Sequence, residues 1–129
     1  MKHIPHISIY SVNHKDQAYE TVGNYIEIDE ECTDFEISKM SDWRMEYMVA
    51  VHEFLEYGLV KHAGIDVKSI DTFDKAFEKK RKKGNTDEPG DDKKAPYFEQ
   101  HQFATKVEKM LCKEFGIKWK DYEKAVNSL

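Results

Sequence analysis

The sequence predicts a single α+β domain, in which a β-rich part, residues 1–40, precedes a helical part, residues 41–129. Three observations predict it. β-Branched and aromatic residues mark short strands in the first part, apolar residues recur at helical spacing in the second, and a length of 129 residues fits one domain rather than two. We therefore expect a short antiparallel β-meander packed on a three-helix bundle.

Three short segments of the first part are predicted to be strands: residues 6–12, 21–28 and 33–37. Each is β-prone, and polar or acidic residues separate one segment from the next. Gly23 lies inside the second segment, where a glycine indicates a bulge or a close approach of another part of the chain. Three strands in a row at short intervals predict the meander.

The helical part begins with a long and unusually apolar segment, residues 42–62. Ser41 is the expected N-cap, and Gly64 is a natural C-terminal stop. Apolar side chains cover more than half of the circumference of this helix. We therefore expect it to be central in the fold.

Further helices follow this central one. The second is capped by Asp66 or Ser69 and ends in the basic run 79–83, which we interpret as a solvated helix end rather than a nucleic-acid site. A polar loop, residues 84–95, leads to a third helix over residues 96–116. The last residues are expected to form a short helix that packs back on the core.

The composition excludes several classes of protein. A net charge of −5 argues against a protein dedicated to duplex nucleic acid, because such proteins carry a basic footprint. The two cysteines, Cys32 and Cys112, are too few for a disulfide framework or a cysteine zinc site. The N-terminus lacks the apolar stretch of a signal peptide, and no apolar run approaches the ~18 residues of a membrane span. We expect a cytoplasmic protein without a membrane partner.

A cluster of polar residues lies on one side of the central helix. Glu46, His52, Glu53 and Glu56 fall within about 120° of its circumference. No Lys or Arg lies between Glu46 and Val60, although the chain contains 20. Adjacent carboxylates repel one another unless a cation or buried protons compensate. This pattern favours a metal site over the alternative, a solvated helix face, which usually carries basic i, i+4 partners.

Two residues of the later helices are candidates to complete this site. Asp74 lies at the edge of the apolar stripe of the second helix, where a carboxylate is costly without a partner. His101 lies at the border of the buried stripe of the third helix. We predict His52, Glu56 and His101 as metal ligands, with Asp74 as a further ligand or a supporting group. Accessory candidates are Asp71, Asp91, Asp92 and Glu108.

Residues 52–56, His-Glu-Phe-Leu-Glu, resemble the H-E-x-x-H motif of the zincin metalloproteases, with glutamate in place of the second histidine. In that motif residues i and i+4 bind one zinc ion from the same helix face, and the intervening glutamate polarises water. The resemblance implies that His52 and Glu56 are ligands, that Glu53 is the general base, and that a third ligand, such as His101, comes from elsewhere.

The pattern Glu53-x-x-Glu56, followed by Asp71-x-x-Asp74, looks like the signature of the all-α nucleotide pyrophosphohydrolases, the MazG-like and dimeric dUTPase-like enzymes. Their E-x-x-E and E-x-x-D pairs hold Mg²⁺ that binds nucleotide phosphates. Aspartate at position 71 and the β-rich N-terminus depart from that family. The resemblance implies nucleotide phosphoanhydride hydrolysis.

Several short segments together, residues 42–44, 88–92 and 95–97 with His101, are similar to small uncharacterised proteins of phages and prophages. This resemblance implies the cytoplasm of a bacterial host. It also implies a role in nucleotide metabolism or in countering host defence.

The leading hypothesis from the sequence is a metal-dependent hydrolase that acts on a small-molecule or peptide substrate. Carboxylate-rich ligation favours Mg²⁺ or Mn²⁺, whereas histidine favours Zn²⁺, so the metal stays open. The alternative is a non-catalytic protein that binds a nucleotide or a host protein. Such a protein is expected to form a homo-oligomer. Glu53→Gln separates the two hypotheses, because a hydrolase loses its activity in that variant and a binding protein is indifferent to it.

Overall fold

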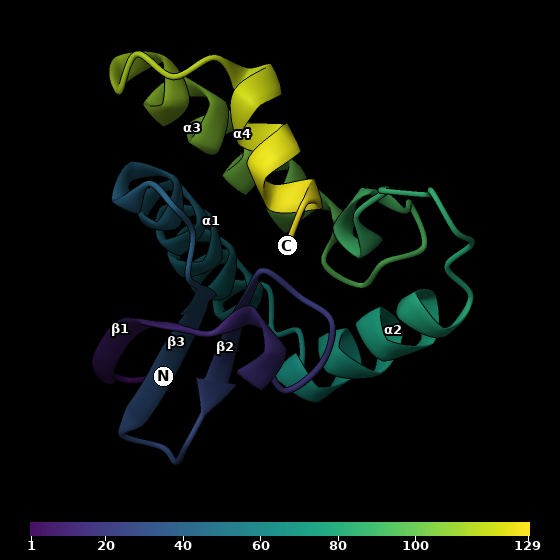
Figure 1. Cartoon of the computed structure of the whole chain (residues 1–129). Coiled ribbons are helices and arrows are strands. Elements are labelled where there is room, and N and C mark those ends of the chain that lie inside the picture. Colours follow the sequence, from purple (N-terminus) through teal and green to yellow (C-terminus); the bar gives the residue numbers. More distant parts are fainter.

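The N-terminal segments form a three-stranded mixed sheet in the computed structural model, which describes residues 1–129 (Figure 1). The strands are β1 (His6–Val12), β2 (Gly23–Glu27) and β3 (Cys32–Ser38), with a 3-10 turn, η1 (His14–Asp16), after β1. β3 is the central strand. β2 pairs with it in antiparallel register, with Tyr25 opposite Phe35, as a hairpin requires.

The expected antiparallel meander is wrong in one respect, because β1 lies parallel to β3 on its other side. β1 and β2 are consecutive in the chain but do not pair with each other, and residues 13–22 carry the chain from one edge of the sheet to the other. The physical reason is the burial of β3. Thr33, Phe35 and Ile37 are all buried, so this strand takes the centre of the sheet.

The helical part contains four α-helices rather than a bundle of three, because the terminal segment forms a full helix. They are α1 (Trp43–His62), α2 (Val67–Lys79), α3 (Phe98–Glu114) and α4 (Trp119–Asn127), with a 3-10 turn, η2 (Pro89–Asp91), in the loop before α3. None of these helices combines the length and the apolar character that crossing a membrane requires.

The helix ends follow local sequence signals. The Asp42 carboxylate, rather than Ser41, caps α1 by accepting the backbone N–H two residues on at 3.0 Å. Asp66 caps α2 in the same way, as one of the two expected caps. Gly64 and Gly116 follow α1 and α3 with φ of 73° and 69°, a conformation that favours glycine, and each lies in a Schellman turn.

Helix α1 lies between the sheet on one side and α3 with α4 on the other, while α2 lies beside the sheet (Figure 1). One hydrophobic cluster joins the sheet, α1, α2 and the segment before α3: Tyr25, Phe35, Tyr57, Val60, Val67, Ile70, Ala95 and Tyr97. A second joins β3, α1, α3 and α4: Ile37, Met48, Val49, Cys112 and Tyr122. Along α1, the buried polar residues His52 and Glu56 lie between these two clusters.

Helix α1 therefore turns its polar cluster inward. His52 and Glu56 are only 5% and 3% exposed, so the solvated-face interpretation is wrong. Part of the apolar arc faces outward instead, with Trp43 65% exposed and Tyr47 and Phe54 also exposed. The helix is central, as expected, but its buried face is the mixed polar one.

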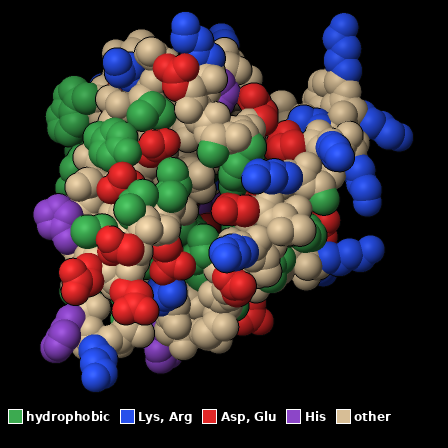
Figure 2. Space-filling view, turned by 90° about the horizontal axis from the view of Figure 1, so that it is seen from below, with side chains coloured by type: hydrophobic (Ala, Val, Ile, Leu, Met, Phe, Trp, Pro, Cys, Tyr) green, Lys and Arg blue, Asp and Glu red, His purple; other side chains and the backbone are tan.

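The basic run 79–83 lies at the end of α2 and beyond it. All of these residues except Arg81 are exposed, and Arg81 pairs with Glu78 at 2.7 Å. Lys and Arg side chains project at the right-hand edge of Figure 2, on the side where α2 ends. These contacts agree with a solvated helix end.

Candidate metal centre

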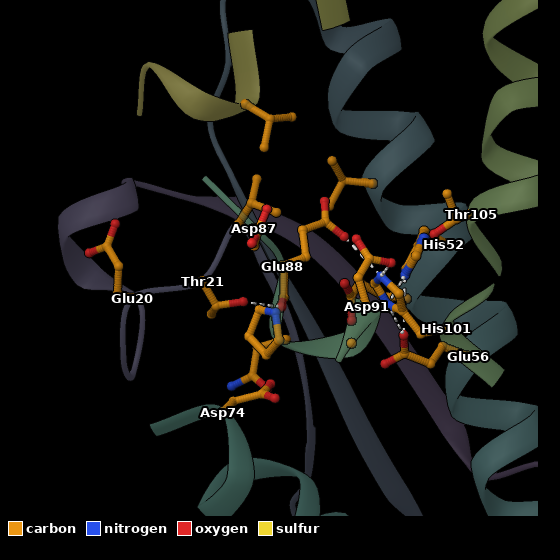
Figure 3. A pocket seen from close by; sticks show the side chains of 18 of the residues that line it. Glu20, Thr21, His52, Glu56, Asp74, Asp87, Glu88, Asp91, His101 and Thr105 are labelled. Carbon is orange, nitrogen blue, oxygen red and sulfur yellow. Dashed lines mark hydrogen bonds and ion pairs between the residues drawn. The ribbon is translucent and has the colours of Figure 1, made fainter. Parts of the chain in front are cut away.

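Three buried side chains from two helices converge on one point (Figure 3). His52 and Glu56 come from consecutive turns of α1, where the i, i+4 spacing places them on one face. His101 comes from the first turn of α3, which packs against α1. The Nε2 atom of His52, the Oε2 atom of Glu56 and the Nδ1 atom of His101 form a triangle with sides of 3.1, 3.0 and 3.1 Å.

The far nitrogen of each imidazole is held by a carboxylate. The Nδ1 atom of His52 lies 2.8 Å from Glu108 of α3, and the Nε2 atom of His101 lies 2.8 Å from Glu88 of the loop before η2. Because an ionised carboxylate only accepts hydrogen bonds, each of these nitrogens carries the proton. In the neutral rings, the nitrogens that face the triangle are then lone-pair acceptors. Outer carboxylates on ligating histidines are the usual support of a protein metal site.

Three acceptor atoms at this spacing repel one another unless a cation or extra protons lie between them. Metal ligands at about 2.0–2.2 Å from an ion lie roughly 2.8–3.1 Å from one another at right angles and roughly 3.3–3.6 Å at tetrahedral angles. The sides of the observed triangle, 3.0–3.1 Å, match the right-angle separations. The group His52, Glu56 and His101 could therefore hold a metal ion.

The protonation of the two histidines agrees with a site that attracts positive charge. Burial alone would lower the pKa of His52, but its contacts with Glu108 and Glu56 outweigh burial and raise the pKa to about 10. For His101, contacts with Asp91, Glu56 and Glu88 likewise outweigh burial and raise the pKa to about 12. In the absence of an ion, protons occupy the place that a cation would take.

Glu56 is fixed from two sides. Its Oε2 atom belongs to the triangle, while its Oε1 atom accepts a hydrogen bond from Tyr25 of β2 at 2.9 Å. Burial opposes ionisation of this carboxyl, but the hydrogen bonds from His101 and His52 outweigh burial and lower its pKa to about 2. Glu56 is therefore an ionised donor that presents a single oxygen.

Glu53 lies beside the triangle and has no hydrogen bond or ion pair. It lines the same cavity as the three donors. Burial and the negative charge of Glu56 raise the pKa of its carboxyl to about 8. Its side chain packs on Gly23 of β2, where an added Cβ would lie 2.8 Å from the Glu53 Cγ. The expected close approach at Gly23 is confirmed, and the chain that approaches is α1.

Asp74 lies in the cavity wall but outside the triangle. From α2, its carboxylate accepts hydrogen bonds from Tyr97 at 2.6 Å and from Tyr19 at 3.1 Å. Burial raises its pKa to about 7, although both tyrosine contacts act in the opposite direction. Asp74 therefore forms a second buried polar group, next to the three donors but separate from them.

The accessory candidates take different places. Glu108 is the buried partner of His52, and its second oxygen accepts a hydrogen bond from Tyr122 of α4. Asp91 lies 3.4 Å from His101 and forms with it and Glu88 a second, more exposed group of donors. Asp71 is half-buried on α2, outside both groups. The side chain of Asp92 instead accepts the backbone N–H of Lys94.

Four residues of the site have no separate signal in the sequence. Tyr25 and Tyr122 orient Glu56 and Glu108 with their hydroxyl groups, and both tyrosines read as ordinary core residues. Glu88 belongs to a loop rich in acidic residues, where nothing marks it out. Gly90 packs on the site without a side chain: a Cβ at that position would lie 2.4 Å from the Cγ of His101, so the loop backbone contacts the ring directly.

A cavity of about 540 Å³ opens beside the triangle. Its wall is formed by the connection before β2, one side of α2, the loop before α3, and parts of α3 and α4. The three donors, Glu53 and Asp74 all line it, so a molecule in the cavity would meet the donor triangle directly (Figure 3).

Comparisons with known proteins give no independent assignment of this site. No protein-family model, no curated protein and no solved structure matches the chain. The function has to be argued from the geometry of the donors and their cavity.

Proposed function

We propose that the protein is a metal-dependent hydrolase in which His52, Glu56 and His101 hold a divalent metal ion and Glu53 is the general base. The observation that carries the proposal is the triangle of three acceptor atoms 3.0–3.1 Å apart, with a carboxylate on the outer nitrogen of each histidine. This arrangement is the one that places two imidazole lone pairs and one carboxylate oxygen on a common point.

The donor set supports hydrolysis more than a purely structural metal. Structural zinc sites usually have four protein ligands, whereas catalytic sites have three and leave a position open to water. Two histidines and one glutamate face a cavity of about 540 Å³, so the open position is accessible. A metal ion bound there would supply an acidified water molecule.

Glu53 supports the proposal from the neighbouring position. A general base needs a carboxylate near the reacting water that is not already used in another contact. Glu53 has no partner, lines the cavity, and has a pKa raised to about 8 by burial and by Glu56. At neutral pH it can exchange a proton with a molecule in the cavity, in contrast to Glu56, which stays ionised.

Two nitrogen ligands favour Zn²⁺ among the three metals considered, with Mn²⁺ next. Mg²⁺ prefers all-oxygen coordination, and this triangle offers only one oxygen. We therefore propose Zn²⁺ as the metal to test first.

Elemental analysis of untagged protein tests the proposal. We expect near-stoichiometric metal in the wild type and its loss in His52→Ala and Glu56→Ala. The matched control is His62→Ala, which removes an exposed histidine from the end of the same helix and should retain the metal. Wild-type protein that remains free of metal after incubation with Zn²⁺ and Mn²⁺ would refute the metal site.

Catalysis is tested separately with Glu53→Gln. This variant should bind metal as the wild type does and lose hydrolytic activity, because the amide cannot accept the proton of the water. Full activity in Glu53→Gln would remove the general base from the proposal while leaving the metal site intact.

A further inference from the structure

We infer that the substrate of this site carries a protonated amine or guanidinium group. This inference deepens the proposed function, because it names the chemical class of the molecule that enters the cavity. It rests on the charge balance of the cavity wall and on buried hydrogen-bonding groups that have no partner in the protein.

The cavity wall is strongly acidic. Eleven aspartate and glutamate residues line it, and burial raises the pKa of two of them, Glu53 and Asp74, to about 8 and about 7. The opposing charges are Arg81, Lys109 and, when no metal is bound, the protonated His52 and His101, so acidic groups remain in excess. A divalent ion on the donor triangle offsets only part of this excess. In a cleft whose wall is partly protein, such an excess of one sign attracts ligands of the opposite sign.

The two basic residues are already engaged. The Arg81 guanidinium contacts Glu78 at 2.7 Å and donates to the backbone carbonyls of Asn85 and Asp87 at 2.6 and 2.7 Å. The Lys109 ammonium lies 5.2 Å from the centre of the Trp119 ring, at cation–π distance. The Arg81 guanidinium is therefore not free to bind a phosphate or a carboxylate group of a ligand, which leaves the Lys109 ammonium as the one basic group of the wall without an ion pair.

Unused hydrogen-bonding groups line the same cavity. Asn24 of β2 is only 6% exposed; its side-chain amide lines the cavity, where it keeps some solvent contact and makes no hydrogen bond within the protein. Thr105 of α3 also lines the cavity, and its buried hydroxyl oxygen has no partner. Buried polar groups normally have partners, so these point to a ligand or water in the cavity. Together with the carboxyl group of Glu53, which also has no partner, they offer hydrogen-bond acceptors to the N–H groups of a ligand.

The acidic groups extend across the cavity from the donor triangle. Figure 3 shows Glu20 and Asp87 on the side away from His52 and Glu56, on the connection before β2 and on the loop before η2. Both are exposed; Glu20 lies 2.9 Å from the Nε2 atom of His14, and the Asp87 carboxylate has no ion pair. A substrate bound by its cationic group near Glu20 and Asp87 would extend its other end towards the triangle.

This charge balance separates the two substrate classes that the sequence leaves open. A nucleotide brings several negative charges to a wall that already has an acidic excess. A basic peptide or a polyamine conjugate brings the opposite charge. Basic peptides and polyamine conjugates both carry a protonated nitrogen. We therefore expect cleavage beside such a group rather than phosphoanhydride hydrolysis.

Isothermal titration of the wild type with three probes tests the inference: spermidine, tri-lysine and Mg-ATP. We expect the amines to bind and Mg-ATP to bind far more weakly. In the double variant Glu20→Gln, Asp87→Asn, amine affinity should fall roughly fivefold to tenfold, as expected for the loss of two partly screened charges. The matched control is Glu30→Gln, Glu114→Gln, which removes two exposed charges outside the cavity and should leave the affinity unchanged.

The two amine probes distinguish a peptide-like from a polyamine-like substrate by their relative affinity. Mg-ATP binding as tight as the amines, no amine binding, or an equal loss in the control variant would each overturn the inference. Metal content measured on the same samples keeps the two proposals apart. Protein that holds metal but binds no amine refutes only the substrate class, whereas protein that binds amines without metal refutes only the hydrolase.

Discussion

At the scale of single residues, the outer carboxylates decide which nitrogen of each histidine faces the triangle. Glu108 is buried and is held in turn by Tyr122, whereas Glu88 belongs to an exposed loop and its side chain is 53% exposed. The orientation of His52 is therefore fixed by the packing of α3 and α4. The orientation of the His101 ring depends on Glu88, which belongs to a solvent-exposed loop.

Glu108→Gln is expected to weaken metal binding about 10- to 100-fold, the usual effect of losing the partner of a ligating histidine. The amide can still accept the Nδ1 proton of His52, but it no longer raises the basicity of the ring by its charge. Competition titration of Zn²⁺ against a chromophoric chelator measures the change. Glu99→Gln, an exposed substitution on the same helix, is the control, and an equal loss there would contradict the prediction.

The raised pKa of Asp74 predicts that the free energy of unfolding depends on pH. Burial raises its pKa in the folded protein from 3.8 to about 7, so folding favours the protonated form. Its contribution to stability is complete below about pH 4 and is lost as the pH rises to about 7, by up to about 4 kcal/mol. Asp74→Asn should lack this loss, so the variant gains stability relative to wild type between pH 4 and pH 8.

Urea unfolding of wild type and Asp74→Asn at several pH values measures this difference. Asp121→Asn, an exposed substitution on α4, is the control. A difference between wild type and Asp74→Asn that stays constant over the whole range would show that Asp74 is not the titrating group.

At the scale of elements, the site depends on a loop that packs on a helix without a side chain between them. Gly90 of η2 lies against the imidazole of His101, and a Cβ would reach within 2.4 Å of the ring. Gly90→Ala should displace the ring or the loop and destabilise the protein by about 1–3 kcal/mol. Metal affinity should fall with it, because His101 is one of the three donors.

Gly58→Ala is the matched control for this substitution. Gly58 lies within α1, where an added Cβ meets nothing within 4 Å, so alanine should stabilise the helix by about 0.5–1 kcal/mol and leave metal binding unchanged. Thermal unfolding and metal titration of both variants give the comparison. Unchanged metal affinity in Gly90→Ala would contradict the tight packing on His101.

Local signals in the sequence predict the elements well, and the order of the strands poorly. Caps, glycine stops and apolar periodicity predict α1 within one residue at its start and α2 at its Asp66 cap. The β2–β3 hairpin follows from the short acidic turn between the strands. No local signal predicts that β1 pairs with β3 on the edge opposite β2. Strand order depends on which strand buries most side chains, and that strand is β3.

At the scale of the whole molecule, a metal ion bound between α1 and α3 should stabilise the fold by mass action. Free Zn²⁺ at 100 times the dissociation constant adds about 2.7 kcal/mol to the free energy of unfolding. Differential scanning fluorimetry should show a higher midpoint with Zn²⁺ and its reversal by a chelator. His52→Ala should have a midpoint that is independent of Zn²⁺, and a shift equal to that of wild type would contradict the site.

The candidate site was predictable to the extent that it depends on helical spacing. His52 and Glu56 are one turn apart on an apolar helix without basic residues, and the sequence alone predicts that they share a face. Their inward direction follows only from the packing of α3, which brings His101 and Glu108 opposite them. The sequence suggests Asp74 as a further ligand or a supporting group, and in the fold two tyrosines bind its carboxylate.

The inward polar face of α1 has a consequence for the order of events during synthesis. His52 and His101 are 49 residues apart, and Glu56 and His101 are 45 residues apart. When α1 leaves the ribosome, its charged face has no partner and stays hydrated, so α1 and the sheet can form only an incomplete core. The packing of α3 on α1 is the step that removes these charges from water. A nascent chain that lacks α3 should therefore continue to bind chaperones.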